Sequence, residues 1–225
     1  MLHNRNKNGR FRRIYQILRT MNFLEFRNKM FDLACFNIDQ VYAWQPDFDR
    51  NNLSRWTKKG LLVRLRQGYF TFPEYKDKRD HAYYFANRIY RPSYVSLHTA
   101  LAFYGMIPET VVQITSVTSL KTASFKNEFG EYIYKSVSGN LIFGYDLKPM
   151  EGGKTLQFAK PEKALLDLLY LYPEYNSKQD FIDLRLDEDF LHYEFNKPLL
   201  LEYKTKFKSK TVERRINLFL STYQL

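Results

Sequence analysis

Amide, hydroxyl and cationic side chains gather between residues 51 and 69, where the chain reads N-N-L-S-R-W-T-K-K-G-L-L-V-R-L-R-Q-G-Y. Asn and Arg side chains can form paired hydrogen bonds with base edges, whereas Lys and Arg bind phosphate oxygens. Such residues in one short segment are typical of contacts with double-stranded DNA. The expected DNA-contacting residues are Asn51, Asn52, Ser54, Arg55, Lys58, Lys59, Arg64, Arg66, Gln67 and Tyr69.

A short helix is expected to present the first half of this set. Asp49 can accept the free N–H groups of its first turn, and Gly60 supplies the left-handed residue that ends it. At about 100° per residue, two opposite faces result. The inner face carries Leu53, Trp56 and Thr57; the outer face carries Asn51, Ser54, Arg55 and Lys58, with Lys59 at its edge.

The second half is expected on a β-hairpin, because the apolar period changes from helical to two after residue 60. Gln67 and Gly68 fit a two-residue turn in which glycine supplies the positive φ. This pairing predicts an apolar face and a basic, aromatic face. The apolar face carries Val63, Leu65, Phe70 and Phe72, and the other carries Arg64, Arg66, Tyr69 and Thr71.

A helix with a cationic outer face followed directly by a basic hairpin indicates the second half of a winged helix-turn-helix. Upstream, the apolar spacing of Phe23, Phe26 and Met30 predicts one helix. Asn37 and Gln40 form a capping pair that predicts another, ending near residue 44. The alternative is a solvated helix and an ordinary hairpin with no nucleic-acid role.

Charge separates the chain into two parts. Residues 1–80 carry 17 Lys/Arg against 8 Asp/Glu, whereas residues 81–225 carry 18 against 16. We therefore expect residues 1–75 to form the DNA-binding domain, with a basic N-terminal extension that is either a solubilising tail or an arm along phosphates. The polar stretch after Pro73 marks the boundary to a second domain, residues 76–225.

The second domain mixes helical and β periods, so the whole chain is expected to be α+β, a winged helix-turn-helix followed by a mixed α/β domain. Helices are expected at 81–90, from Ser93 or Ser96 to about 104, from Pro161 to about 172, and through most of the chain after 181. Strands are expected at 111–120, 132–137 and 141–147.

The residues show no catalytic constellation, no cofactor motif and no metal-ligand spacing, so we expect a protein that is not an enzyme. His98 fits a hydrogen-bonded helix residue better than a catalytic base, and Glu131 with Lys135 lacks the second carboxylate of a nuclease. The single cysteine, Cys35, fits a buried thiol in a reducing compartment. No apolar run approaches the ~20 residues of a membrane span, and the N-terminus lacks an apolar signal core. We therefore expect a cytoplasmic protein without membrane contact.

Three stretches together resemble the AbiEi-type antitoxins of bacterial type IV toxin–antitoxin systems. They are L-S-R-W-T-K-K-G-L-L-V-R-L-R-Q-G-Y-F-T-F-P, Y-V-S-L-H-T-A-L-A-F-Y-G-M-I-P-E and Q-F-A-K-P-E-K-A-L-L-D-L-L-Y. The first is similar to the recognition helix and wing of that family, the second to the opening helix of its second domain, and the third to its "A-x-P-E-K-A-L-x-D" helix. In order, they span about residues 23–172.

The resemblance implies a repressor that binds inverted repeats in its own promoter through the winged domain. It also implies a second domain that counteracts a cognate nucleotidyltransferase-like toxin. The matched positions place DNA contacts on Asn51, Ser54, Arg55, Lys58, Arg64 and Arg66. Two other hypotheses remain: a nuclease or nucleotidyltransferase that uses the winged part for targeting, and a protein-interaction module without a DNA role.

Overall fold

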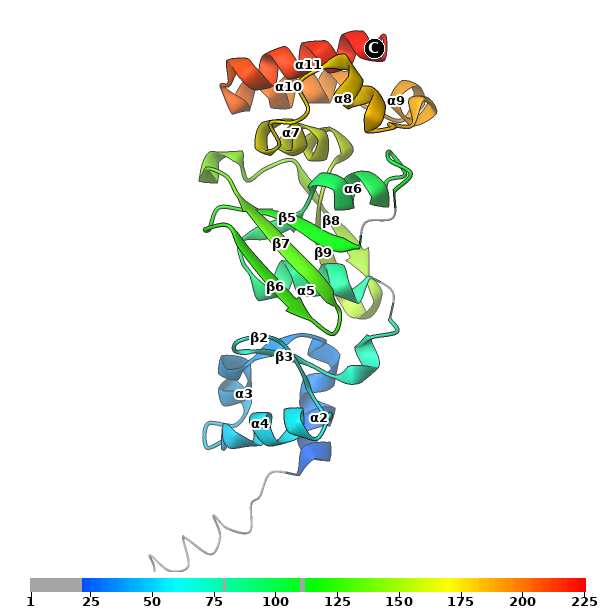
Figure 1. The fold of residues 1–225 in the computed structure, drawn as a ribbon. Coiled ribbons are helices and arrows are strands. Elements are labelled where there is room, and N and C mark those ends of the chain that lie inside the picture. Colours follow the sequence, from blue (N-terminus) through cyan, green and yellow to red (C-terminus); the bar gives the residue numbers. More distant parts are fainter. Residues whose placement is uncertain (1–21, 79, 110–111) are drawn as a thin grey trace, which may run out of the picture. The chain divides into compact units, whose positions relative to one another are not determined.

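The computed structural model describes residues 22–78, 80–109 and 112–225, and the chain divides into two compact units (Figure 1). The first unit runs up to Val63 and includes Gly68–Pro73, and the second comprises Arg64–Gln67 and Glu74–Leu225. The described part is α+β, with ten α-helices, one three-stranded sheet and one six-stranded sheet. The expected basic N-terminal extension lies outside the described residues.

The first unit places short helices before a small sheet. Its elements are α2 (Phe23–Met30), a 3₁₀ turn (Phe31–Leu33), β1 (Phe36–Asn37), α3 (Ile38–Trp44), α4 (Asn51–Lys58) and β3 (Tyr69–Thr71), whereas β2 (Val63–Arg66) starts at the last residue before Arg64–Gln67 of the second unit. The strand order is β1-β3-β2. The expected capping pair is confirmed at the start of α3: the Asn37 side chain accepts the N–H of Gln40 and the Gln40 side chain accepts that of Asn37, both at 3.0 Å.

Aromatic rings form the core of the first unit. Phe26 is fully buried, and its ring centroid lies 4.6 Å from that of Trp56 and 5.6 Å from that of Phe48. Phe36 on β1 and Phe72, the residue after β3, are also fully buried, and their ring centroids are 5.6 Å apart. Aromatic rings from both helices and strands therefore pack together and hold α4 against the sheet.

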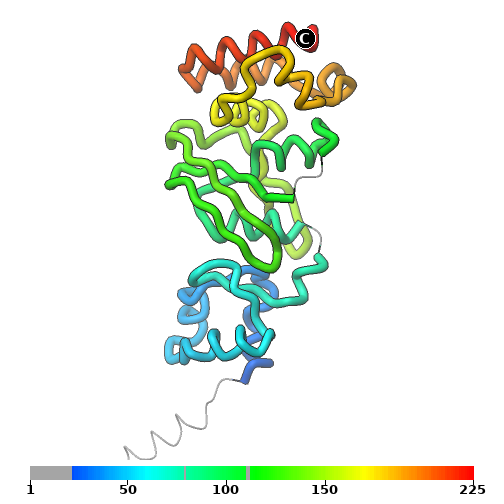
Figure 2. Tube along the Cα trace, in the orientation of Figure 1, coloured from blue at the N-terminus to red at the C-terminus, as the bar shows by residue number. Residues whose placement is uncertain are grey.

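The second unit contains α5 (His81–Ile89), β4 (Ser93–Val95), α6 (Leu97–Phe103), β5 (Gln113–Thr118), β6 (Ala123–Asn127), β7 (Gly130–Ser136), β8 (Tyr145–Met150), β9 (Lys154–Ala159) and α7 (Pro161–Leu171). Four helices follow: α8 (Lys178–Asp183), α9 (Glu188–Tyr193), α10 (Lys197–Phe207) and α11 (Lys210–Thr222). Figure 2 traces this helical end of the chain beyond α7.

Several strands differ from the sequence-based expectation. Ser93 is the first residue of β4 and does not start a helix. Of the two expected helix starts, only Ser96 is compatible with α6. Leu141 lies in a 3₁₀ turn and the following strand starts at Tyr145. Strands β6 and β9 were not predicted, and they complete the sheet order β6-β7-β5-β4-β9-β8.

Helices cover both faces of the six-stranded sheet. Tyr134 on β7 donates a hydrogen bond to the carbonyl of Ala86 in α5, at 2.8 Å. Thr115 on β5 faces the other way, where its hydroxyl lies 3.0 Å from that of Thr99 in α6. Helix α7 adjoins α6 and is also packed against α10 and α11, so it lies inside the unit (Figure 1).

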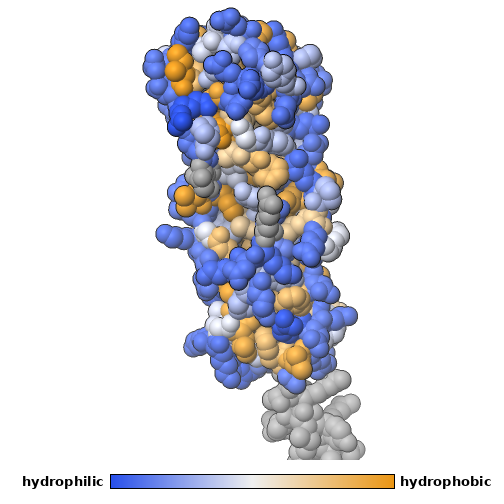
Figure 3. All heavy atoms as spheres, turned by 90° about the vertical axis from the view of Figure 1, so that its right-hand side faces the viewer, coloured by the Kyte–Doolittle hydropathy of each residue, from blue (hydrophilic) through white to orange (hydrophobic). Residues whose placement is uncertain are grey.

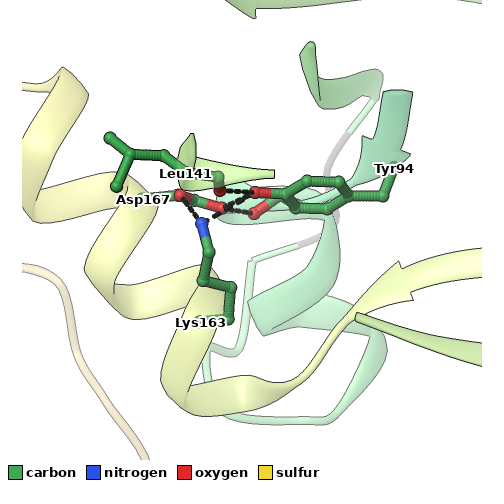
Figure 4. Close-up of polar contacts among 5 residues, drawn as sticks. Tyr94, Leu141, Lys163 and Asp167 are labelled. Atoms are coloured by element: carbon green, nitrogen blue, oxygen red, sulfur yellow. Dashed lines mark hydrogen bonds and ion pairs between the residues drawn. The ribbon is translucent and has the colours of Figure 1, made fainter. Parts of the chain in front are cut away.

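Because α7 has neighbours on all sides, every residue from Glu162 to Leu169 is buried. Two of them, Lys163 and Asp167, are one helical turn apart and form an ion pair with both side chains inaccessible to solvent. Asp167 also accepts hydrogen bonds from the hydroxyls of Tyr94, at 2.9 Å, and Ser96, at 2.8 Å (Figure 4). Buried charges require such partners.

The ammonium group of Lys163 has further neighbours. It donates a hydrogen bond to the Tyr94 oxygen at 2.7 Å and lies within 4.9 Å of the Phe143 ring centroid and 5.1 Å of that of Phe207. Burial lowers the pKa of Lys163, whereas the neighbouring Asp167 carboxylate acts in the opposite direction. Burial, together with Asp167, raises the pKa of Tyr94, which stays a neutral phenol.

No helix among the described residues is both long enough and apolar enough to cross a lipid bilayer. Hydrophilic side chains cover most of the face drawn in Figure 3, with several separate apolar patches between them.

We predict that Lys163→Met destabilises the protein by about 3–5 kcal/mol, because it leaves the Asp167 carboxylate buried without a counter-charge. Adding Asp167→Asn removes that charge but keeps an oxygen for Tyr94 and Ser96. The double variant should therefore unfold at a higher urea concentration than Lys163→Met alone. Equal or lower stability of the double variant would contradict the ion-pair account.

Candidate nucleic-acid interface

Helix α4 has the two faces that the sequence predicts. Leu53 and Trp56 are buried, at 2% and 7% exposure, and Thr57 is half-buried. The opposite side is open to solvent. The exposed side chains there are Asn51, Ser54, Arg55, Lys58 and Lys59, whereas Asn52 is half-buried.

The ends of α4 follow from local capping. The Asp49 carboxylate accepts the N–H of Asn51 at 2.9 Å, although the residue immediately before the helix is Arg50. At the other end, Gly60 adopts a φ of 69°, which the lack of a Cβ permits. The amide of Leu61 then bonds the carbonyl of Trp56 at 2.9 Å and closes the helix. The cationic face is therefore fixed over its whole length.

Arg55 is held by neighbours on its own face. Its guanidinium lies 2.6 Å from a carboxylate oxygen of Asp49 and 2.7 Å from the amide oxygen of Asn52. Both partners of the ion pair remain at least half exposed, with 60% of the Arg55 side chain and 50% of the Asp49 side chain accessible. An exposed pair of this kind contributes only about 0–1 kcal/mol. Separating Arg55 from Asp49 therefore costs little free energy.

The hairpin confirms the expected turn, with β2 ending at Arg66, β3 starting at Tyr69, and Gly68 at a φ of 83°. Val63, Leu65 and Phe70 are buried as expected. Arg64 and Gln67 are exposed, whereas Tyr69 is half-buried. Thr71, expected on the solvent face, is instead fully buried, and its hydroxyl donates a hydrogen bond to the carbonyl of Ala34 at 2.5 Å.

Arg66 also departs from the expected exposed position. Its guanidinium donates to the carbonyl of Ile89 at 2.6 Å and lies 4.9 Å and 4.4 Å from the ring centroids of Tyr90 and Phe125. A guanidinium stacked on rings and bonded to a carbonyl is already desolvated in part. Arg66 therefore belongs to the packing of the second unit.

Other residues at this interface gave a weaker signal in the sequence. Arg50 precedes α4 and is exposed, so it adds a cation beside the outer face. In the sequence, the indication for Arg50 was its position directly after the capping residue Asp49. The partners of Arg66 could not be inferred locally, because Ile89 lies 23 residues away along the chain.

The enzyme alternative is best considered at a hollow of about 480 Å³ in the second unit, beside α6 and β5. Its lining includes His98, Glu109, Gln113, Tyr172, Tyr175 and Asp183. Burial lowers the pKa of His98, and burial with nearby Glu174 raises that of Tyr175 to about 12. The Tyr175 hydroxyl lies 2.7 Å from His98 Nε2, within hydrogen-bond distance. His98 is thus hydrogen-bonded, as expected.

The carboxylates around this hollow are paired with other side chains. Glu109 faces Arg185 at 3.6 Å, Asp183 accepts from Gln179 at 2.7 Å, and Glu131 accepts from Gln113 at 3.1 Å. Lys135, two residues after Ile133 on β7, lies over the Tyr172 ring. Within the described residues, no group of three His, Cys, Asp or Glu side chains has a metal-binding arrangement. The residues around this hollow do not indicate a particular reaction.

No protein-family profile matches this sequence, and no curated protein is significantly similar to it.

We predict that Asp49→Asn tightens DNA binding about threefold, because the amide keeps the cap on Asn51 while releasing Arg55 from its ion pair. Fluorescence anisotropy on a labelled duplex at low salt would measure the change. The matched control is Asp47→Asn, which removes the same charge from the same loop without an ion pair to Arg55. Equal effects of the two substitutions would show that Asp49 does not restrain Arg55.

Proposed function

We propose that this protein is a transcriptional repressor whose first unit is a winged helix-turn-helix that binds double-stranded DNA. The observation that supports this most directly is the exposed face of α4, where amide, hydroxyl and cationic groups lie opposite a buried indole. Surface exposure alone would not support it. The support comes from the face together with the order of elements, in which α4 follows α3 after a short turn and precedes a hairpin.

The dimensions of α4 suit the major groove. An α-helix with its side chains is about 10–12 Å in diameter, and the groove is about 12 Å wide. In the proposed complex, Asn51 and Arg55 read base edges, and Lys58 and Lys59 bind phosphates. Arg66 has no role in this proposal because Ile89, Tyr90 and Phe125 already engage it.

Autorepression and the antitoxin role are further parts of the proposal, and they are supported by the three AbiEi-like stretches alone. In this account the operator is an inverted repeat in the protein's own promoter, and the second unit counteracts a nucleotidyltransferase-like toxin. Co-expression with such a toxin encoded beside this gene should restore growth. Continued growth arrest would remove the antitoxin part and leave DNA binding untouched.

We predict that two substitutions on α4 separate specificity from electrostatic affinity. Arg55→Ala should cost about 1–3 kcal/mol on the preferred duplex and little on a scrambled one. Lys58→Ala/Lys59→Ala should weaken both duplexes similarly and lower the slope of log affinity against log salt by about 2. Anisotropy titrations across a salt series measure both effects.

The control is Lys178→Ala/Lys197→Ala, which removes the same charge from exposed positions on α8 and α10. It should leave the salt slope unchanged. Wild-type protein without salt-dependent affinity for any duplex would reject the proposal, and so would identical losses in the α4 variants and this control.

A further inference from the structure

The hollow of about 480 Å³ beside α6 and β5 combines buried apolar residues with exposed carboxylates. Ile107 and Leu184 are buried, at 4% and 8% exposure. Glu109 and Asp183 are exposed, so their carboxylates lie where the hollow meets solvent. In the described part of the chain, no lysine or arginine lines this hollow. The lining is therefore acidic in a chain whose net charge is +11.

Strand register brings the sheet residues of the lining to one face. Gln113 and Thr115 lie two positions apart on β5, and Thr115 pairs with Ile133 on the parallel strand β7. Side chains at such positions point to the same side of a sheet. The Thr115 hydroxyl lies 3.0 Å from that of Thr99 in α6. The hollow is therefore on the side of the sheet that α6 covers.

One wall of the hollow is aromatic. The ring centroids of His98 and Tyr172 are 5.5 Å apart, with planes at 88°, and those of Tyr172 and Tyr175 are 6.5 Å apart. The faces of such rings attract organic cations. The chain contains one example, because the Lys135 ammonium lies 5.2 Å from the Tyr172 ring centroid. Burial and the nearby carboxylate of Glu174 raise the pKa of both tyrosines, so a negative charge also acts on this wall.

The partners of the lining carboxylates leave most of their negative charge in place. Glu109 lies 3.6 Å from Arg185, with 47% and 69% of the two side chains exposed, and an exposed pair of this kind is weak. Asp183 accepts a hydrogen bond from Gln179, whose amide is neutral. Burial lowers the pKa of His98, so this side chain is uncharged at pH 7 and adds no positive charge.

We propose that this hollow binds a small organic amine, a molecule that joins a protonated nitrogen to a short apolar body. The body packs against Ile107, Ile133 and Leu184, and the ammonium group lies at the opening, where Glu109 and Asp183 attract it. At about 30 Å³ per water, the volume corresponds to roughly 16 water molecules, and it falls within the range of about 300–1,000 Å³ that is typical of small-molecule sites. This site lies in the second unit and is independent of the proposed DNA interface.

Ligand-observed NMR titrations of the full chain with phenethylamine and 2-phenylethanol at pH 7 test the proposal. The two probes share a carbon skeleton and differ in the terminal group, a charged ammonium in one and a neutral hydroxyl in the other. Phenethylamine should bind saturably and at least fivefold more tightly than 2-phenylethanol. The proposal is overturned if phenethylamine does not bind saturably, or if the neutral probe binds as tightly.

Asp183→Asn tests the predicted charge contact without removing a buried side chain. It should weaken phenethylamine binding about fivefold, the effect of one unit charge about 4 Å away in a water-like medium. The affinity for 2-phenylethanol and the thermal unfolding temperature should not change, since the amide still accepts the hydrogen bond of Gln179. A purely structural role of Asp183 would instead alter binding of both probes equally and contradict the proposal.

Glu202→Gln is the matched control for charge. Glu202 is exposed on α10 and is not part of the lining, so its substitution removes the same charge from another place. This variant should bind phenethylamine as the wild type does. Equal losses in Glu202→Gln and Asp183→Asn would show that only the overall charge of the protein matters, and would overturn the site.

A second pair of variants tests the aromatic wall. Tyr172→Leu should weaken phenethylamine binding about threefold, the loss of one ring that faces a cation. Tyr170→Leu is its control, because Tyr170 is 38% exposed on the same helix and outside the lining. Both variants are compared at a temperature at which circular dichroism shows them folded. Equal affinity of the two would contradict the proposed wall.

Discussion

The packing of Trp56 is the constraint on which the proposed interface depends. The indole lies in contact distance of the rings of Phe23, Phe26 and Phe48, with centroids 5.2, 4.6 and 5.9 Å away. Rotation of α4 about its axis would expose this large apolar side chain, at a cost of about 1.5–3 kcal/mol or more. The face that carries Arg55 therefore has to be the solvent face. DNA recognition, in this account, is a consequence of where one aromatic ring is buried.

A comparable constraint organises the second unit. Helix α7 packs against the sheet and against α10 and α11, so its polar residues need partners inside the protein. Lys163 and Asp167 form an ion pair and both bond the Tyr94 hydroxyl, while Glu162, in the first turn of α7, accepts the N–H of Asn196 at 2.7 Å. The P-E-K-A-L-L-D stretch is thus explained by packing. Its charged residues hold strand, helix and C-terminal segment together.

Local signals in the sequence predicted local structure well. The capping pair at Asn37, the turn at Gly68 and the two faces of α4 each depend on residues within a few positions of one another, and the structure confirms them. Ser93 was ambiguous because a serine suits both a helix cap and a short strand. β6 was missed because its alternation of half-buried and exposed residues lacks the apolar side chains of a typical strand.

Contacts distant in sequence could not be predicted. Arg66 alternates with apolar residues as an exposed wing cation would, yet its position is decided by Ile89, Tyr90 and Phe125. The buried charge on α7 was likewise hidden, since the apolar stripe of that helix gave no sign that its other side is covered too. Sequence periodicity identifies one buried face of an element, and the tertiary fold decides whether the second face is also buried.

Methylation interference at guanine N7 tests the central claim most directly, because N7 is accessible only in the major groove. Duplexes would first be selected by the full chain from a random-sequence pool, then partially methylated and sorted by binding. The account predicts a shared motif in which methylation of particular guanines prevents binding by the wild type. Selected duplexes without a common motif, or binding that is insensitive to N7 methylation at every guanine, would contradict recognition through α4.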